Sequence, residues 1–265
     1  MDWTTHTLNC SILYGAIPFR DALFRARSAG FGDVEFWWPF TTADPPADEV
    51  DEFVDAVAQT GVRLRGMNLF AGDMVAGDRG VLSWPGREAE LAASVGVAQR
   101  VAEATGCAIF NALYGRRQAS TPAAAQDDLA LLNLSTIAAA MAEVGGTVVV
   151  EPVSGFTDYP LTSAADVVRL LDSCDGAVRA NTGLLLDVYH LSVNGDDVAC
   201  AITDHASRIK HVQIADAPGR GIPGSGELPI ASWLAQLAQA GYSGRVALEF
   251  QSTEDPFIPR KEEAS

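Results

Sequence analysis

The stretch Val148-Val149-Val150-Glu151 is a short hydrophobic run that ends in a carboxylate. Three later runs share this form and end in a side chain that can bind a metal ion: Leu184-Leu185-Leu186-Asp187, His211-Val212-Gln213 and Val246-Ala247-Leu248-Glu249. The polar residues are 36, 26 and 36 positions apart (151 to 187, 187 to 213, 213 to 249), and one strand–helix unit takes roughly 30. A buried carboxylate is costly unless it has a partner. Four such groups at one end of parallel strands predict an oxygen-rich metal site on a barrel rim.

The rest of the chain alternates short apolar runs with longer, alanine-rich amphipathic segments. Strand candidates are Thr7–Leu13, Asp33–Trp37, Arg63–Asn68, Ala108–Leu113, Thr147–Glu151, Gly183–Asp187, Ile209–Ile214 and Arg245–Phe250. Helix candidates are Phe19–Ala29, Ala47–Gln59, Pro85–Thr105, Pro122–Val144, Ser163–Asp172, Asp196–His205 and Ile230–Ala240. This order predicts a single α/β domain over residues 1–265, a (β/α)8 barrel whose eighth helix is short or missing. An open doubly wound sheet is the rival fold, but no GxGxxG motif follows the first strand.

Composition limits the classes of function. The 265 residues are close to the roughly 250 that such a barrel commonly needs. Lys and Arg number 18 against 34 Asp and Glu, a net charge of −16 that argues against nucleic acid or anionic membranes as partners. The four cysteines form no CxxC pair, the N-terminus has no basic region followed by an apolar core, and no apolar stretch approaches roughly 20 residues. We therefore expect a cytoplasmic protein with free thiols.

Three carboxylates and an amide oxygen form a hard ligand set. Glu151, Asp187, Gln213 and Glu249 should therefore prefer Mg²⁺ or Mn²⁺ to zinc, which favours histidine or thiolate. Glu151 and Glu249 close strands five and eight, so they would approach the metal ion from different sides. One could remove a proton beside a polarised carbonyl and the other return it to the adjacent carbon through an enediolate. This is isomerase chemistry without a redox cofactor. The simpler alternative is four unrelated strand-end residues that cap neighbouring helices.

Four further residues are candidate substrate contacts. His190 lies three positions after Asp187, and Asn68 ends the third predicted strand. Arg220 lies in the glycine-rich loop after the seventh strand and could bind an anionic substrate through two hydrogen bonds. Arg87, later in the loop after the third strand, is a second candidate for an anion contact. His211 is interpreted as a core histidine, and the aromatic segment after Glu35 could wall the pocket or belong to the core.

Ordered motifs along nearly the whole chain resemble the hydroxypyruvate isomerase family of the xylose isomerase-like barrels. They are Gly32-Asp33-Val34-Glu35-Phe36, Ala71-Gly72-Asp73, Gly77-Asp78-Arg79-Gly80, Pro85-Gly86-Arg87-Glu88, Glu151-Pro152, Asp187-Val188-Tyr189-His190, Gln213-Ile214-Ala215-Asp216 and Gly226-Glu227. The resemblance implies metal ligands at Glu151, Asp187, Gln213 and Glu249, with Glu151 and Glu249 as the acid–base pair. One departure is Gln251, because family members usually have lysine there.

The family resemblance implies an aldose–ketose type isomerase, an intramolecular oxidoreductase that interconverts hydroxypyruvate and tartronate semialdehyde with Mg²⁺ or Mn²⁺. A ketose 3-epimerase, a 2-oxo-tetronate isomerase and a 3-keto-sugar lyase on the same barrel are alternatives. Metallo-endonucleases share the barrel but need several histidine ligands and a basic surface. A barrel that only binds a ligand is the remaining alternative. The expected partner is a small keto acid or ketose, and a homo-oligomer is a further possibility.

Overall fold

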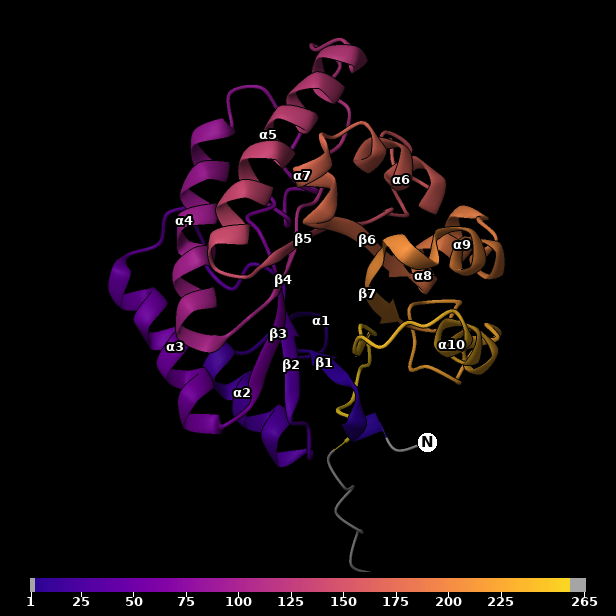
Figure 1. Cartoon of the computed structure of the whole chain (residues 1–265). Coiled ribbons are helices and arrows are strands. Elements are labelled where there is room, and N and C mark those ends of the chain that lie inside the picture. The colour runs from indigo at the N-terminus through magenta and orange to yellow at the C-terminus, as the bar shows by residue number, and fades with distance from the viewer. Residues whose placement is uncertain (1–2, 258–265) are drawn as a thin grey trace, which may run out of the picture.

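The computed structural model describes residues 3–257, in which eight parallel strands close into a barrel. The strands run around the barrel in sequence order, and β8 pairs with β1. Their bounds are β1 Thr7–Asn9, β2 Asp33–Phe36, β3 Arg63–Asn68, β4 Ile109–Asn111, β5 Thr147–Val150, β6 Thr182–Asp187, β7 Ile209–Ile214 and β8 Val246–Leu248. The predicted single-domain (β/α)8 barrel is confirmed, and the open doubly wound sheet is excluded (Figure 1).

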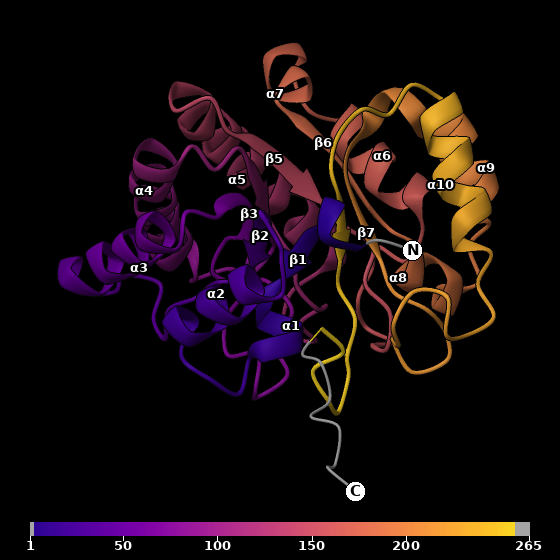
Figure 2. The ribbon, with the colours of Figure 1, turned by 90° about the horizontal axis from the view of Figure 1, so that it is seen from below.

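Ten α-helices within residues 3–257 surround the strands. They are α1 Cys10–Tyr14, α2 Phe19–Ser28, α3 Ala47–Thr60, α4 Glu88–Thr105, α5 Ala123–Glu143, α6 Ala164–Asp172, α7 Gly176–Ala180, α8 Val188–Asn194, α9 Val198–His205 and α10 Ile230–Gln239. Helices α9 and α10 lie side by side on one flank of the barrel, and α3, α4 and α5 cover the opposite flank (Figures 1 and 2). All seven predicted helices are present, with ends shifted by up to three residues.

Two of the three helices that the sequence analysis missed begin at polar caps. The strand predicted over Thr7–Leu13 ends at Asn9, because Asn9 Oδ1 accepts the backbone N–H groups of Ser11 (3.1 Å) and Ile12 (3.2 Å) and starts α1. Asp187 caps α8 in the same way, which places His190 in the first turn of a helix. The third missed helix is the short α7.

The alternation of side chains along the strands separates the outer core from the barrel interior. In β6, Leu184 and Leu186 belong to the core between strands and helices, whereas Leu185 lines the interior together with His211 and Gln213 of β7. Full burial of a leucine side chain contributes about 1.5–3 kcal/mol. The hydrophobic runs therefore stabilise the barrel wall and fix which polar side chains point inward.

The register of β2 on β3 shifts between Val34 and Glu35. Such an irregularity can re-aim a side chain, and Glu35 points into the barrel.

Beyond β8, residues 249–257 contain no helix, which agrees with the predicted absence or shortness of an eighth helix. Residues 258–265 lie outside the described part of the chain. Within residues 3–257, no helix is both long and apolar enough to cross a bilayer.

Candidate active site

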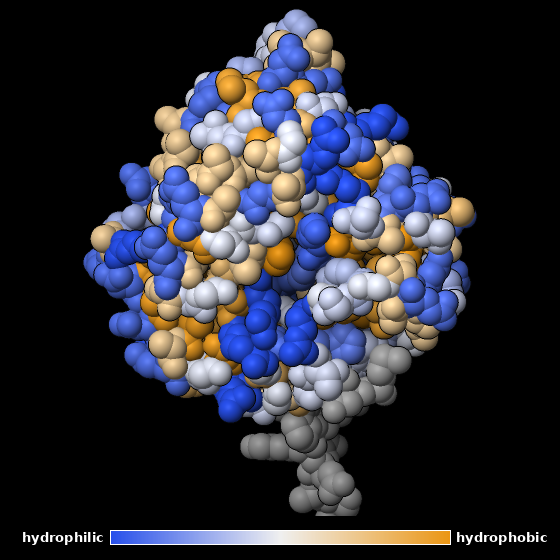
Figure 3. All heavy atoms as spheres, in the orientation of Figure 1, coloured by the Kyte–Doolittle hydropathy of each residue, from blue (hydrophilic) through white to orange (hydrophobic). Residues whose placement is uncertain are grey.

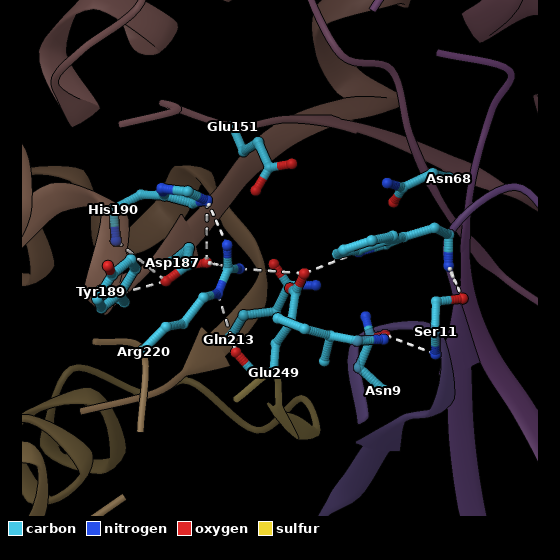
Figure 4. Close-up of polar contacts among 12 residues, drawn as sticks. Asn9, Ser11, Asn68, Glu151, Asp187, Tyr189, His190, Gln213, Arg220 and Glu249 are labelled. Atoms are coloured by element: carbon cyan, nitrogen blue, oxygen red, sulfur yellow. Dashed lines mark hydrogen bonds and ion pairs between the residues drawn. The ribbon is translucent and has the colours of Figure 1, made fainter. Parts of the chain in front are cut away.

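The four strand-end residues lie together at the carboxyl end of the barrel. Glu151 directly follows β5, Asp187 ends β6, Gln213 lies in β7 and Glu249 directly follows β8. Each is at most 6% exposed. Figure 4 shows these side chains around one space, which Asn68 faces from the other side. The space-filling view shows the opposite face of the barrel, at the amino ends of its strands, where hydrophilic side chains gather just below the centre (Figure 3).

Glu151, Asp187 and His190 form a group that could hold a metal ion. One ligand atom from each lies within 4.8 Å of the others, and all three residues are buried. The sequence analysis expected His190 as a substrate contact, and the helix start at Asp187 brings it beside the two carboxylates. Glu249 is not part of this group, and its carboxylate has other partners.

Those partners are Arg220 and Trp37. The guanidinium Nη2 of Arg220 lies 3.0 Å from Asp187 Oδ2 and 3.1 Å from Glu249 Oε1, between the two carboxylates (Figure 4). The indole Nε1 of Trp37 donates to the same Glu249 oxygen at 2.8 Å. Arg220 was predicted to bind an anionic substrate through two hydrogen bonds. In this structure its charge is instead paired with two of the predicted metal ligands.

His190 is enclosed between Ser154 and Arg220. Its Nδ1 accepts the backbone N–H of Ser154 at 3.0 Å and lies 2.7 Å from the Ser154 hydroxyl, while Nε2 faces Arg220 Nη1 at 3.0 Å. Burial, together with the nearby charges of Arg220 and Arg79, lowers the pKa of His190 to about 4, although Asp187 opposes the shift. The imidazole is therefore neutral at pH 7 and can form hydrogen bonds without carrying a charge.

A buried carboxylate network lies directly beneath these groups. Glu35 Oε1 accepts from Gln213 Nε2 (2.7 Å) and Asn9 Nδ2 (2.9 Å), and Glu35 Oε2 lies 2.7 Å from His211 Nε2. Burial by itself raises the pKa of Glu35, but His211, Gln213 and Asn9 together hold it below its usual value. His211 is thus the partnered core histidine that was expected. Because the amide nitrogen of Gln213 is fixed on Glu35, its Oε1 is left for another partner.

Two buried oxygens among the predicted ligands have no hydrogen-bond partner within the described residues: Gln213 Oε1 and Glu249 Oε2. Burial, followed by the charge of Asp187, raises the pKa of Glu151 to about 8, against the hydrogen bond that Asn111 Nδ2 donates to Glu151 Oε1 at 2.7 Å. Burial also raises the pKa of Glu249 well above its usual value, although Arg220 opposes this. The site therefore concentrates more acceptor oxygens and negative charge than its own donors satisfy.

The site opens into a cavity of about 590 Å³ lined by Glu151, His190, Arg220, Glu249 and Asn68, among others. A second cavity of about 480 Å³ shares Trp37 and Asn68 with the first and reaches Arg87. Arg87 contacts Glu90 and lies 3.9 Å from Asp78, so its charge is partly paired. All four predicted substrate contacts thus line these adjoining cavities.

Sequence reasoning did not single out the roles of Trp37, Asn111, Ser154, Glu35 and Arg79. Asn111 ends β4 beside Asn68 in register, and an alignment of strand ends would have found it. Trp37 belongs to the aromatic segment after Glu35, for which wall and core were left open. The structure divides that segment, because Trp37 lines both cavities, Phe36 belongs to the core, and Phe40 belongs to the core and also borders the second cavity.

A closed barrel of eight parallel strands with helices outside is a TIM barrel, and active sites of such barrels lie at the carboxyl ends of the strands. The model of the xylose isomerase-like TIM barrel family matches residues 23–265, and the chain belongs to this family.

Within the family, the chain is similar to several isomerases. It is 41% identical over 254 residues to the Streptomyces coelicolor protein named "Putative hydroxypyruvate isomerase", with 94% of this chain and 91% of the relative covered. It is 31% identical to the 2-oxo-tetronate isomerase of Cupriavidus necator, with 92% and 91% covered. A solved structure of an AP endonuclease, family 2, from Brucella melitensis superposes with a TM-score of 0.82 at 29% identity and 93% coverage of both chains. The chain is an enzyme of the aldose–ketose isomerase type, similar to hydroxypyruvate isomerases.

Proposed function

We propose that this enzyme is a metal-dependent isomerase that interconverts hydroxypyruvate and tartronate semialdehyde by proton transfer through an enediolate. The observation that carries the proposal is the convergence of Glu151, Asp187, Gln213 and Glu249 at one end of the barrel, with two of their buried oxygens unpartnered. The similarity to proteins named for this reaction supports the choice of substrate.

The residues present fit a divalent cation. Gln213 Oε1 and Glu249 Oε2 are buried acceptors without donors, and Glu151 and Asp187 already lie close enough to share an ion. Carboxylate and amide oxygens favour Mg²⁺ or Mn²⁺. Such a cation would polarise the substrate carbonyl and so acidify the neighbouring C–H bond. We assign the four oxygen ligands to Glu151, Asp187, Gln213 and Glu249. We assign His190 to the substrate, because it lines the cavity and its neutral imidazole stands apart from the oxygen ligand set.

The two glutamates would move the proton. In the forward direction, one carboxylate removes a proton from C3 of hydroxypyruvate, and the resulting enediolate receives a proton at C2 from the other. The hydroxyl proton passes from the oxygen on C3 to the oxygen on C2, so the product is the aldehyde isomer with no net loss of atoms. A group with a pKa of about 8, as for Glu151, can both take and give a proton near neutral pH.

Neutral His190 and cationic Arg220 line the cavity and would contact the substrate oxygens. His190 can donate to or accept from a hydroxyl without changing its charge, whereas Arg220 can stabilise negative charge that develops on oxygen. Trp37 holds Glu249 through its indole N–H, which limits the positions that this carboxylate can adopt.

A second candidate reaction uses the same groups on a longer substrate. The 31% identity to a 2-oxo-tetronate isomerase favours it, and cavities of about 590 and 480 Å³ leave room for a fourth carbon. A ketose 3-epimerase and a 3-keto-sugar lyase stay further alternatives on this barrel. Nucleic acid cleavage, suggested by the endonuclease structure, is disfavoured by the net charge of −16.

The test is a conversion assay followed by proton NMR with Mg²⁺ or Mn²⁺ and the full-length protein. Hydroxypyruvate, a 2-oxo-tetronate and a neutral hexulose are offered separately. Formation of tartronate semialdehyde in the metal-containing sample, abolished by EDTA, is the expected result. Faster conversion of the 2-oxo-tetronate would transfer the assignment to the four-carbon acid, and epimerisation of the hexulose alone would exclude both acids.

A further inference from the structure

Three arginines line the two adjoining cavities, and their charges are compensated differently. Arg220 contacts Asp187 and Glu249, and Arg87 contacts Glu90 and Asp78. Arg79 lines the larger cavity with Arg220, yet it forms no ion pair with any residue of the described range 3–257. The neighbouring Asp78 forms no ion pair with Arg79 within residues 3–257; its Oδ2 accepts the backbone N–H of Asp73 at 2.8 Å, although its charge opposes the lowering of the pKa of Arg79 by burial. Arg79 is thus a cation whose charge faces the cavity without a carboxylate partner.

The backbone around Arg79 holds it in this position. Its Nη1 donates to the carbonyl oxygens of Met74 (3.0 Å) and Asp78 (2.6 Å). The next residue, Gly80, has a φ of +107°, and a Cβ there would lie 2.0 Å from the carbonyl oxygen of Leu113. Only glycine therefore permits this close approach to the segment after β4. These contacts fix the position of Arg79 within its loop.

The guanidinium of Arg79 lies over the ring of Phe156, with its Cζ 4.5 Å from the ring centroid. Arg116 approaches the same ring at 5.1 Å, but its Nε lies 2.8 and 3.0 Å from the two carboxylate oxygens of Asp158. Two arginines at one aromatic ring would repel each other, and Asp158 neutralises one of them. The other, Arg79, retains its charge. Its Nε and Nη2 have no hydrogen-bond partner among residues 3–257, which leaves two N–H groups on one edge for a ligand.

We propose that Arg79 binds the carboxylate of the substrate and thereby selects keto acids over uncharged ketoses. A guanidinium edge with two free N–H groups matches a carboxylate in a bidentate arrangement. An anionic substrate needs such a cation in the cavity, because a chain with a net charge of −16 repels small anions. Arg79 is a specificity residue distinct from Arg220, and the inference rests on the proposed isomerase function for the identity of the acid.

The decisive experiment is equilibrium binding of tartronate, a dicarboxylate that cannot be isomerised, to the Mn²⁺-loaded full-length protein by calorimetry. Arg79→Met removes the charge and keeps an apolar stem over Phe156, and Arg79→Lys keeps the charge without the planar edge. Arg100→Met is the matched control, because Arg100 pairs with Asp51 on the outside of α4. We expect Arg79→Met to weaken tartronate binding about 10- to 150-fold, Arg79→Lys to weaken it less, and Arg100→Met to match the wild type.

A kinetic comparison complements the binding measurement. Dihydroxyacetone is hydroxypyruvate with its carboxylate replaced by a hydroxymethyl group. Arg79→Met should raise KM for hydroxypyruvate and leave KM for dihydroxyacetone within about twofold of the wild type, because only the former carries the charge that Arg79 recognises.

The outcomes separate this inference from the proposed function. Wild-type affinity for tartronate in folded Arg79→Met, or no binding of tartronate to the wild type, would overturn the role of Arg79 and leave the isomerase proposal standing. If the wild type converts no keto acid or ketose with either metal, the proposed function fails, and tartronate binding still decides the role of Arg79. If Arg79→Met does not fold, Arg79→Lys is compared with the wild type for tartronate affinity. Equal affinities of these two proteins would contradict bidentate recognition by Arg79.

Discussion

Arg220 holds Glu249 at two points. Its Nε donates to the backbone carbonyl oxygen of Glu249 at 3.1 Å, and its Nη2 lies 3.1 Å from Oε1 of the same residue. Arg220 adopts a φ of +56°, a conformation that costs energy for a residue other than glycine. The backbone N–H of Gln251 donates to the carbonyl oxygen of Arg220 at 2.7 Å. The guanidinium is therefore positioned between carboxylates that a metal ion would also use.

Removal of this guanidinium should strengthen metal binding. In Arg220→Met, Asp187 and Glu249 lose a cationic partner that competes with the metal ion and repels it. We expect Mn²⁺ affinity, measured by electron paramagnetic resonance titration, to rise about tenfold, equivalent to about 1.4 kcal/mol. Arg100→Met should leave it unchanged. Weaker Mn²⁺ binding in Arg220→Met would show that Arg220 organises the ligands and does not compete for them.

Glu35 should control metal affinity without touching the metal ion. It fixes the amide of Gln213 so that Oε1 is free, and partners of this kind typically change metal affinity about 10- to 100-fold. Glu35→Gln should lower Mn²⁺ affinity by a factor in that range at a temperature where the variant is fully folded. If the thermal midpoint falls but Mn²⁺ affinity does not, Glu35 only stabilises the barrel.

The two proposed acid–base residues should affect turnover more than metal binding. Glu151→Gln and Glu249→Gln each retain an oxygen ligand but remove the group that transfers the proton. Turnover of hydroxypyruvate should fall at least about 100-fold in each variant, since general acid–base catalysis contributes about 10²–10⁴-fold. Mn²⁺ titrations of the same samples serve as the control. Near-normal turnover in both variants would contradict a two-carboxylate mechanism.

The raised pKa of Glu151 predicts how the stability of the metal-free protein depends on pH. Its ordinary pKa is 4.5 and its pKa in the folded protein is about 8. A proton bound more tightly in the folded state stabilises it fully below pH 4.5, and this contribution is lost as the pH rises through about 8. In EDTA, the free energy of unfolding should therefore fall between pH 5 and 8.

The matched variants for this measurement are Glu151→Gln, which cannot lose a proton, and Glu143→Gln, an exposed position in α5. Glu151→Gln should reduce the loss of stability by at least about 1.4 kcal/mol, the equivalent of one pKa unit. Glu143→Gln should retain the wild-type loss. If Glu151→Gln leaves the pH dependence of the free energy of unfolding unchanged, the Glu151 carboxyl is already ionised in the folded wild-type protein.

The fold and the strand-end residues could be predicted because they depend on local patterns. Hydrophobic runs such as Leu184–Leu186 identify strands, and the residue that ends a parallel strand necessarily lies at the carboxyl end of the barrel. The same reasoning placed Asp187 correctly but missed its second role as the cap of α8, since a single aspartate at a strand end gives no sign of the helix that follows.

Contacts between distant segments could not be predicted. Trp37 and Glu249 are 212 positions apart, and nothing in either local sequence indicates that the indole reaches the carboxylate. The pairing of each arginine is equally non-local. Arg220 was expected to bind an anionic substrate and is paired with two carboxylates, while Arg79 forms no ion pair within residues 3–257. Charge compensation depends on which loops meet over the cavity, and the sequence pattern of a loop does not specify that.

The most direct test of proton transfer between Glu151 and Glu249 is solvent isotope incorporation. Hydroxypyruvate is incubated in D₂O with the wild-type protein and Mg²⁺ or Mn²⁺, and the product is analysed by NMR and mass spectrometry. The two-carboxylate account predicts tartronate semialdehyde that carries deuterium at C2, no labelled product in EDTA, and loss of label incorporation in Glu151→Gln and Glu249→Gln. Tartronate semialdehyde formed without deuterium at C2 would contradict it, because the hydrogen would then pass directly from C3 to C2 as a hydride.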